Sequence, residues 1–521
     1  MKKVVVIGAG PAGITAAYEL IKKGGYDVTL LEQSEVFGGI SKTVNADGNR
    51  MDIGGHRFFS KDKRVTEWWS IFLKPQGKPS KDDILLGRDK ELAPGGVDPE
   101  TDDLVMLKRE RVSRIYYNNA LFDYPVSLSL NTLRNMGMIT TIKAGFSYIA
   151  TIFKKLPEEN LENFYINRFG KVLYSMFFEG YTEKLWGRHP REISAEWGAQ
   201  RVKGLSVIAV LKDIFGKLFK VKGRKVETSL IERFEYPKYG PGQLWTVVTD
   251  EIKRLGGTVL TGKKVLQIES DENGKIKRVI CSDNTGFDCD ELISSMPVKD
   301  LVIALKDVPE VVGQIAIGLP YRDFQTVGVL IPADKLLLRN SGKTPTVGGI
   351  TPDCWIYVQD TSVSLGRIQI FNNWSPYMVK EFDKHVWLGL EYFCSEGDES
   401  WEKSDNECID FALKELIQIG VISSASDVLA THRERVEKAY PAYFDTYSEF
   451  NTLRENLDTI PNLYCVGRNG QHRYNNMDHS MLTAFEAVDC IITENDNKAA
   501  VWNVNTEEEY HETKSETNAK T

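Results

Sequence analysis

Three glycines near the N-terminus have the spacing of a dinucleotide-binding turn. Gly8, Gly10 and Gly13 follow an apolar run and open an amphipathic one. In a strand–turn–helix unit the first glycine permits the tight turn, the second lets the backbone approach a pyrophosphate, and the third lets the helix pack closely on the strand. The pyrophosphate then lies at the helix N-terminus beside Ala12, where unpaired N–H groups favour negative charge. Glu32, 24 residues after Gly8, is placed to accept a hydrogen bond from a ribose hydroxyl.

Two glycine pairs further along the chain favour FAD over NAD as the dinucleotide. Gly38-Gly39 follows Glu32 by a few residues, and a second pair ends in Gly55, just before His56. Paired glycines let backbone N–H groups approach a phosphate or a flavin ring without a Cβ in the way. The two segments resemble the later FAD signatures of glutathione-reductase-type flavoproteins, and in particular those of the amine oxidase superfamily.

Two later segments, 291–295 and 462–493, resemble further flavin-binding parts of the same superfamily. The second segment reads as a strand at 462–466, a polar loop and a helix at 481–493. The resemblance implies an FAD site built from distant parts of the chain. The residues expected to contact FAD are Gly8, Gly10, Ala12, Gly13, Glu32, Gly38, Gly39, Gly55, His56, Val265, Gly467, Arg468, Asn476, Met477, Asp478 and Ser480.

Several motifs narrow the resemblance to the UDP-galactopyranose mutase family, particularly to its longer, eukaryotic-type members. His56 matches the family's loop histidine beside the flavin, and residues 181–187 match its uridine-side helix motif. Arg201 stands where one diphosphate-binding arginine is expected. Residues 354–357, together with Arg367, are similar to the segment that supplies a tyrosine and a second arginine. These motifs occur in family order over nearly the whole chain.

The residue types fit a UDP-sugar. Two arginines can clamp a diphosphate through bidentate hydrogen bonds, and tyrosine hydroxyls can donate to its oxygens. The resemblance implies catalytic roles for His56, which positions the flavin side, and for Arg201 and Arg367, which hold the leaving diphosphate. The residues expected to contact the substrate are Phe177, Tyr181, Trp186, Arg201, Tyr357, Arg367, Tyr440 and Tyr474.

The resemblance implies a mutase that interconverts the pyranose and furanose forms of a UDP-sugar through a reduced-flavin N5 adduct, with NADH or NADPH as the reductant. Two positions depart from the family pattern. Trp374 stands where a phosphate-reaching tyrosine is usual, and Asn476 where bacterial members often carry aspartate. The alternative activity is that of an FAD-dependent oxidoreductase of the protoporphyrinogen oxidase or amine oxidase type, acting on an apolar or amine substrate. A non-enzymatic FAD-binding assembly factor is a third interpretation.

The elements that must position these residues occur in three separated stretches, 3–32, 242–297 and 462–493, each with strand–helix patterns. A helix-rich and a strand-rich insert lie between them. This spacing predicts an α/β fold in which an FAD-binding Rossmann-like domain of the glutathione-reductase type carries a helical insert and an antiparallel-sheet substrate domain. The predicted parts are an FAD-binding domain (1–75, 236–300 and 425–495), a mainly helical insert (76–235), a substrate domain (301–424) and a disordered tail (496–521).

Composition restricts the partners. The 521 residues carry a net charge of −8, so no dominant basic surface indicates a nucleic-acid partner. The seven cysteines form no CxxC pair, which predicts reduced thiols in a cytoplasmic protein and neither a disulfide framework nor a metal site. The oligomeric state is left open.

Two stretches bear on membrane contact. Residues 137–153 are apolar but are interrupted by Lys143 and by several serines and threonines, so they are not expected to span a bilayer. Residues 205–225 mix apolar side chains with lysines. This pattern favours a packed helix with a solvated basic face, and leaves peripheral membrane contact as the alternative.

Overall fold

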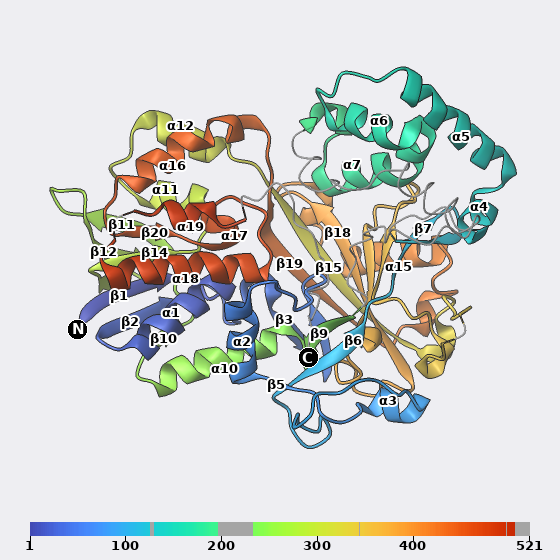
Figure 1. Cartoon of the computed structure of the whole chain (residues 1–521), viewed down its shortest axis with the longest axis horizontal. Helices are drawn as coiled ribbons and strands as arrows, with labels where there is room; N and C mark the ends of the chain where they lie inside the picture. The colour runs from blue at the N-terminus through green and yellow to red at the C-terminus, as the bar shows by residue number, and fades with distance from the viewer. Residues whose placement is uncertain (125–129, 196–232, 343, 496, 506–521) are drawn as a thin grey trace, which may run out of the picture.

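The computed structural model describes residues 1–124, 130–195, 233–342, 344–495 and 497–505. Figure 1 shows two units side by side: a parallel sheet with its helices, and a larger sheet with a group of helices at its outer edge. The seven cysteines are buried, and each is a free thiol.

A five-stranded sheet, in which every neighbouring pair is parallel, forms the centre of the first unit. Its strands are short apolar runs, as expected for a sheet covered on both faces. Side chains of β1 alternate between two cores: Val4 and Val6 pack with one group of helices, Val5 and Ile7 with the other. The strands, in spatial order, are β10 (Thr258–Leu260), β2 (Tyr26–Leu31), β1 (Lys2–Ile7), β14 (Glu291–Ser294) and β20 (Leu463–Cys465).

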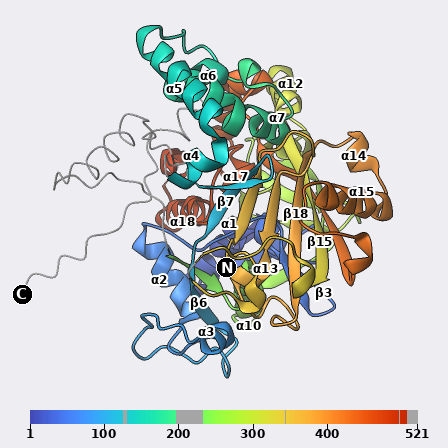
Figure 2. The ribbon, with the colours of Figure 1, turned by 90° about the vertical axis from the view of Figure 1, so that its right-hand side faces the viewer.

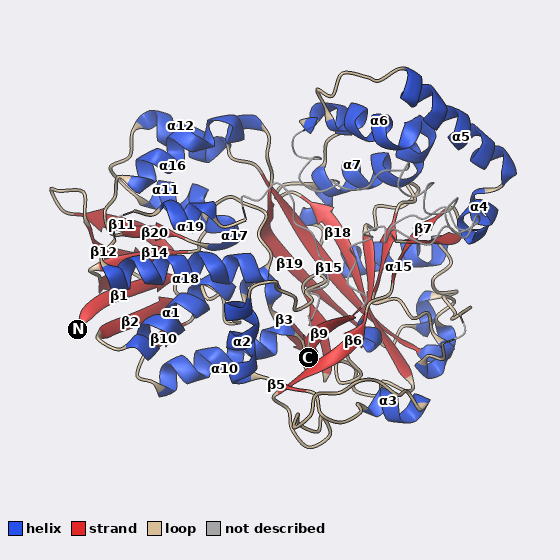
Figure 3. Ribbon diagram, viewed as in Figure 1, coloured by secondary structure: helices blue, strands red, loops and turns tan. Residues whose placement is uncertain are grey.

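Helices cover one face of this sheet, and a small antiparallel sheet with further helices covers the other (Figure 3). The first face carries α1 (Pro11–Lys23), α2 (Lys63–Phe72), α10 (Pro241–Arg254) and α18 (Met477–Thr493). The second carries β11 (Val265–Ser270), β12 (Ile276–Cys281), β13 (Gly286–Asp288), α11 (Val298–Ala304), α12 (Glu310–Gly318) and α16 (Phe450–Asp458). The predicted α/β class and Rossmann-like unit are thereby confirmed.

The second unit is built on a seven-stranded sheet in which only the β16–β7 pair is parallel. The strands, in spatial order, are β19 (Ala430–Pro441), β15 (Tyr321–Pro332), β18 (His385–Cys394), β17 (Arg367–Ile370), β16 (Trp355–Val358), β7 (Ser113–Tyr117) and β8 (Ala120–Asp123). Figure 2 shows this sheet from the side, with α15 (Asp405–Gln418) packed against it.

Two segments of this sheet differ from the sequence-based division. Residues 113–123 were expected in a mainly helical insert and 430–441 in the nucleotide-binding part, yet both extend the seven-stranded sheet. Their partners are distant in sequence, since Ser113 pairs with Trp355, and Val436 with Phe324. Pairing across such separations leaves no signal in the local pattern.

The insert is helical only in part. Its helices are α3 (Lys81–Leu86), α4 (Leu130–Met136), α5 (Met138–Phe153), α6 (Leu161–Tyr174) and α7 (Gly180–Trp186). Besides β7 and β8, it contains the strand β6 (Val105–Glu110) and the start of β9 (Arg233–Pro237), and β5 (Lys74–Pro75) directly precedes it. Across the described ranges, no helix is both long and apolar enough to span a bilayer. The basic stretch 205–225 lies outside the described residues.

The remaining elements are short. They are β3 (Thr43–Ala46), β4 (Asn49–Asp52), α13 (Phe371–Trp374), α14 (Glu399–Glu402), α17 (Gly467–Gly470) and α19 (Ala499–Asn503). The helix α19 corrects one expectation, because the tail was predicted to be disordered from residue 496. Trp502 is only 2% exposed, and its Nε1 donates to Asp458 Oδ1 at 2.8 Å. Two buried apolar residues, Val501 and Trp502, anchor a segment whose average composition is polar.

Candidate functional site

A long cavity of about 1060 Å³ lies between the two units. One end is lined by Gly8 and Glu32 from the parallel sheet, the other by Tyr357 and Arg367 from the seven-stranded sheet. The volume is at the upper end of the range of about 300–1,000 Å³ typical of ligand sites. A cavity of this size can hold a dinucleotide together with a second ligand.

The predicted glycine turn lines the first end of the cavity. Gly8 has φ +92°, and a Cβ on it would overlap the Ser295 hydroxyl. A Cβ on Gly13 would overlap the Gly8 carbonyl oxygen, so the third glycine allows α1 to pack directly on the turn. The requirement for glycine is therefore steric at both positions.

Two more glycine segments approach this turn. Gly39 lies opposite Gly10, where a Cβ on Gly39 would come within 3.3 Å of the Gly10 Cα. Gly38 N–H donates to the Ala9 carbonyl at 2.8 Å, which fixes the two segments together. A Cβ on Gly467, which has φ +76°, would come within 3.0 Å of the Ala12 Cβ. The sequence-predicted glycines thus converge on one backbone-lined concavity.

Glu32 is buried at the end of β2, and its carboxylate holds this turn. Oε2 accepts from the Ala9 N–H at 2.7 Å, and Oε1 accepts from the Ser34 N–H and hydroxyl at 2.9 and 2.8 Å. A carboxylate offers about four lone-pair sites, so acceptor capacity remains toward the cavity. Val265, at the start of β11, lines the same end.

The N-termini of two long helices meet at the middle of the cavity. Pro11 and Ala12 of α1 line it, as do Met477 and Ser480 of α18. The helix α18 begins at Met477, four residues before the predicted start, because Asn476 and His479 form a capping box. Helix N-termini favour anionic groups. This part of the cavity suits a pyrophosphate.

His56 lines the cavity beyond the pyrophosphate region. Its Nε2 lies 2.8 Å from the Ile53 carbonyl oxygen. Desolvation lowers the pKa of His56 from 6.5 to about 4, and the charges of Arg468 and Arg367 act in the same direction. The ring is therefore neutral at physiological pH. A Cβ on Gly55, its neighbour, would crowd Gln369 Nε2 and the Trp374 ring.

Arg367 forms the cationic centre of the other end. Its Nη2 lies 2.7 Å from Glu391 Oε2 and donates to the Tyr440 hydroxyl at 2.8 Å. Arg367 and Glu391 are direct partners across the β17–β18 pair, so the sheet register creates this ion pair. Glu391 is fully buried and raises the pKa of Arg367.

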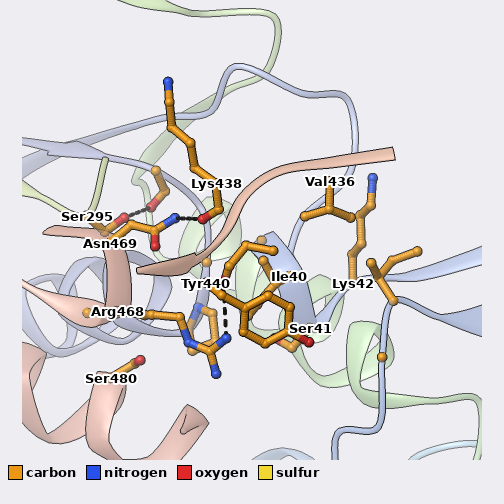
Figure 4. A pocket seen from close by; sticks show the side chains of 18 of the residues that line it. Ile40, Ser41, Lys42, Ser295, Val436, Lys438, Tyr440, Arg468, Asn469 and Ser480 are labelled. Atoms are coloured by element: carbon orange, nitrogen blue, oxygen red, sulfur yellow. Dashed lines mark hydrogen bonds between the residues drawn. The ribbon is translucent and has the colours of Figure 1, made fainter. Parts of the chain in front are cut away.

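Two tyrosines and Arg468 stand next to Arg367. The rings of Tyr440 and Tyr474 stack at 5.9 Å, and the Arg468 guanidinium lies 4.5 Å from the Tyr474 ring centroid. Figure 4 shows Tyr440, from the end of β19, beside Arg468 from α17. Burial raises the pKa of Tyr440. The Tyr440 hydroxyl oxygen accepts a hydrogen bond from Arg367, and its O–H can still donate to an anionic oxygen of a ligand.

Three predicted substrate residues do not line the cavity. Phe177 packs on Phe122 in a small core, with ring centroids 5.2 Å apart, and Trp186 is buried in the core of the second unit. Tyr181 stands behind Tyr357 in an edge-to-face contact at 5.7 Å. Aromatic residues of this kind fill cores as readily as ligand sites, and the sequence alone does not separate the two roles. Arg201 lies outside the described residues.

Trp374 was expected at the position of a phosphate-reaching tyrosine, but it does not line the cavity. Its indole N–H donates to the Cys354 carbonyl at 2.9 Å and to Gln369 Oε1 at 3.0 Å. Its ring is buried and stacks on Trp355 at 5.3 Å. This indole is therefore a structural support beneath the cavity wall.

Cavity residues that the sequence analysis missed include Arg57, Arg111 and Trp355. The Arg111 guanidinium lies 5.0 Å from the Trp355 ring centroid. Arg57 directly follows His56, which was a usable signal, whereas Arg111 lies in an ordinary basic stretch. Together with Arg367 and Arg468 they make this end of the cavity cationic. Among the residues that the structure describes, no cluster of histidine, cysteine and carboxylate side chains could hold a metal ion.

Comparisons with known proteins agree with this geometry. Residues 6–72 match the model of the NAD(P)-binding Rossmann-like domain. The structure is similar to that of reduced UDP-galactopyranose mutase, with a TM-score of 0.74 and 20% identity over 98% of this chain and 100% of the other. A cyclohexylamine oxidase from Brevibacterium oxydans gives a TM-score of 0.58 with 14% identity, over 95% and 99% of the two chains.

Similarity in sequence is confined to part of the chain. An L-amino-acid oxidase from Crotalus adamanteus is 30% identical over 131 residues, which cover 25% of this chain and 22% of that protein. The chain spans a quarter or less of the length of such curated relatives. The resemblance indicated by the motifs is confirmed at the level of the fold. The chain has the fold that UDP-galactopyranose mutase shares with cyclohexylamine oxidase, and its residues 6–72 resemble a Rossmann-like NAD(P)-binding domain.

Proposed function

We propose that this chain binds FAD and, with the flavin reduced by NADH or NADPH, interconverts the pyranose and furanose forms of a UDP-sugar. The observation that carries the proposal is the junction of two chemistries in one cavity. A glycine-lined concavity at the ends of parallel strands continues into an arginine- and tyrosine-lined end. The first suits a dinucleotide, and the second suits a diphosphate-bearing substrate.

The fit to FAD is supported by the glycine contacts. Side chains at Gly8, Gly13 or Gly39 would fill or distort the concavity, and the two helix N-termini provide donors for a pyrophosphate. On this proposal Glu32 would hold the adenosine ribose, and His56, as a neutral ring, would lie beside the flavin. Bound and reduced, the flavin would supply the nucleophilic centre of the reaction.

The substrate end would bind and orient the diphosphate. Arg367 retains a buried Nε–H that donates to no other described residue, and the Tyr440 O–H remains available. Charge-assisted bonds from these groups would hold the leaving diphosphate during the reaction. The stacked Tyr440 and Tyr474 rings would exclude water from it. No side-chain acid or base is required on this proposal.

The alternative is an oxidoreductase that acts on an apolar or amine substrate. The fold neighbours and the partial match to an L-amino-acid oxidase favour it. The charge of the cavity counts against a cationic amine, because Arg57, Arg111, Arg367 and Arg468 all line it. These cations would repel an ammonium group and attract a diphosphate.

The test uses the purified flavoprotein under anaerobic conditions. The protein is reduced with dithionite, supplied with UDP-galactopyranose or UDP-galactofuranose, and the products are separated by chromatography. Interconversion is expected only with reduced protein. Arg367→Lys should weaken UDP binding at least tenfold, because lysine has no counterpart of the Nε–H donor, while the exposed Arg278→Lys should not. Absence of both turnover and UDP-sugar binding would refute the mutase proposal, and hydrogen peroxide release from an amine would support the alternative.

A further inference from the structure

The buried residues of the helix α5 are small, and most of its large apolar side chains are exposed. Ala144 and Thr151 are its buried residues. The exposed fractions reach 72% at Ile139, 70% at Phe146 and 86% at Phe153. The exposed large apolar residues of α5 are Met138, Ile139, Ile142, Phe146, Ile149, Ile152 and Phe153. We name this set the α5 stripe.

The stripe is continuous along the helix. Its members recur at spacings of three and four residues, which places them on one face of an α-helix. The opposite face packs closely on α6, since a Cβ on Gly170 would come within 2.8 Å of the Tyr148 nitrogen. Figures 1 and 2 both show α5 at the outer edge of the helical group, away from the parallel sheet. Soluble proteins rarely expose a contiguous apolar patch of this kind without a binding role.

The charges beside the stripe indicate its partner. Residues 130–155 contain four cationic side chains and no acidic one. Lys143, Lys154 and Lys155 are exposed along the helix and at its C-terminal end. In the loop that follows, Glu158 is paired with Arg168 at 2.8 Å. An apolar stripe flanked by lysines is the pattern of a helix that lies in the interface of an anionic membrane.

We infer that α5 docks this protein on an anionic lipid surface, with the helix lying in the plane of the interface. The helix has 16 residues and is about 24 Å long, too short to cross a hydrocarbon core of about 30 Å. A second copy is the less suitable partner, because a two-fold contact between identical stripes would bring like charges together, and residues 130–155 contain no acidic side chain to oppose them. The inference is independent of the mutase proposal.

The test is co-sedimentation of the 521-residue flavoprotein with vesicles. Vesicles of phosphatidylcholine with about 30% phosphatidylglycerol, which have roughly physiological charge density, are compared with vesicles of pure phosphatidylcholine. Binding is expected with the anionic vesicles and should weaken as salt is raised. Ile142→Glu/Phe146→Glu should reduce it at least tenfold. Replacing Lys143, Lys154 and Lys155 together by alanine should reduce it roughly a hundredfold, at about fivefold for each lysine.

Controls separate the membrane from other partners. Ile317→Glu alters an apolar side chain that is 59% exposed on α12, and should leave vesicle binding unchanged. Flavin absorbance and UDP-sugar binding report whether each variant keeps its site. Equal behaviour of the wild type with both vesicle types would overturn the inference. It would also be overturned if light scattering showed that the double variant converts a dimer into a monomer, or if the variant lost thermal stability, since the stripe would then be covered by protein.

Discussion

Arg367 lines the cavity and forms an ion pair with Glu391, which is fully buried on the neighbouring strand. A buried pair of this kind adds little net stability, but removal of one partner leaves an uncompensated charge in a low-dielectric environment. Glu391 therefore determines the orientation of the arginine and the cost of losing its partner. The sequence gives a hint of this role, since Glu391 is the one charged residue of the strand β18.

Glu391→Gln should lower the free energy of unfolding by about 3–5 kcal/mol, because the Arg367 charge is left unpaired. Urea titration followed by tryptophan fluorescence measures it. Glu381→Gln, which removes an exposed partner of Lys384, should change the same quantity by less than about 0.5 kcal/mol. Equal effects of the two substitutions would contradict the role assigned to the buried pair.

The ionisation of Asp52 makes a pH-dependent contribution to the free energy of unfolding, and the direction of its pKa shift fixes the sign. It accepts from the Thr43 hydroxyl at 2.7 Å and from Tyr236, and burial raises its pKa from 3.8 to about 7. Between pH 4 and 7 the unfolded chain releases this proton while the folded protein retains it, so the free energy of unfolding falls as pH rises. His56 and His472, whose pKa values are lowered to about 4, act with the opposite sign below about pH 6.5.

Asp52→Asn isolates the carboxyl from the two histidines. The stability of the variant relative to the wild type should increase with pH between 4 and 7, by up to about 1.4 kcal/mol per pH unit. Urea titrations at several pH values in that window measure the difference. A difference that is independent of pH would show that Asp52 ionises normally.

At the scale of elements, the turn between β1 and α1 depends on the space around its glycines. Gly8 and Gly25 have almost the same positive φ, +92° and +87°. Only Gly8 is crowded, since no described atom lies near the position of a Cβ on Gly25. The pair therefore separates backbone strain from a steric clash with Ser295 inside the turn.

Gly8→Ala should abolish retention of FAD, because the new Cβ would displace the Ser295 hydroxyl and distort the turn. Gly25→Ala carries a similar backbone cost, of about 1 kcal/mol, and should retain the flavin. The ratio of flavin to protein absorbance after gel filtration measures both. Retention of FAD by both variants would place the dinucleotide elsewhere.

The helix α19 is short, yet it closes one of the two cores of the parallel sheet through Trp502. Trp502→Ala should lower the free energy of unfolding by about 3–5 kcal/mol through loss of packing. Trp502→Phe, which keeps most of the ring but loses the bond to Asp458, should cost clearly less. An unchanged thermal midpoint for the alanine variant would show that this helix does not contribute to the core.

At the scale of the whole molecule, the cavity joins the two units. Gly8 and Glu32 come from one sheet and Arg367 and Tyr440 from the other. A ligand that contacts both should therefore couple their stabilities. Coupling of this kind is a consequence of binding to the folded state alone.

Removal of FAD should lower the thermal midpoint of the whole protein. Flavin present at about a hundred times its dissociation constant stabilises the folded state by about 2.7 kcal/mol. Calorimetry of the protein before and after flavin removal, and after reconstitution, measures the change. A midpoint that does not recover on reconstitution would indicate irreversible unfolding and not loss of the ligand.

Local sequence was enough to predict the β1–α1–β2 unit at one end of the cavity. Its strands and helix are regular, and the expected positions of Gly8, Gly13 and Glu32 follow from short-range spacing. The same applies to the helix α18, apart from its start, where the cap at Asn476 adds a turn. Short-range patterns suffice here because a strand–turn–helix unit is stabilised largely by contacts close in sequence.

Only the tertiary structure decided the second end. The Arg367–Glu391 pair depends on strand register, and Ser113 pairs with Trp355 across 242 positions. Phe177 and Trp186 are packed in hydrophobic cores. The Trp374 N–H donates to the Cys354 carbonyl, and Arg111 lines the cavity. An aromatic or an arginine side chain has the same local signature in a core, at a surface and in a site. Which of these it occupies is fixed by the partners that distant strands bring to it, and that information is not local.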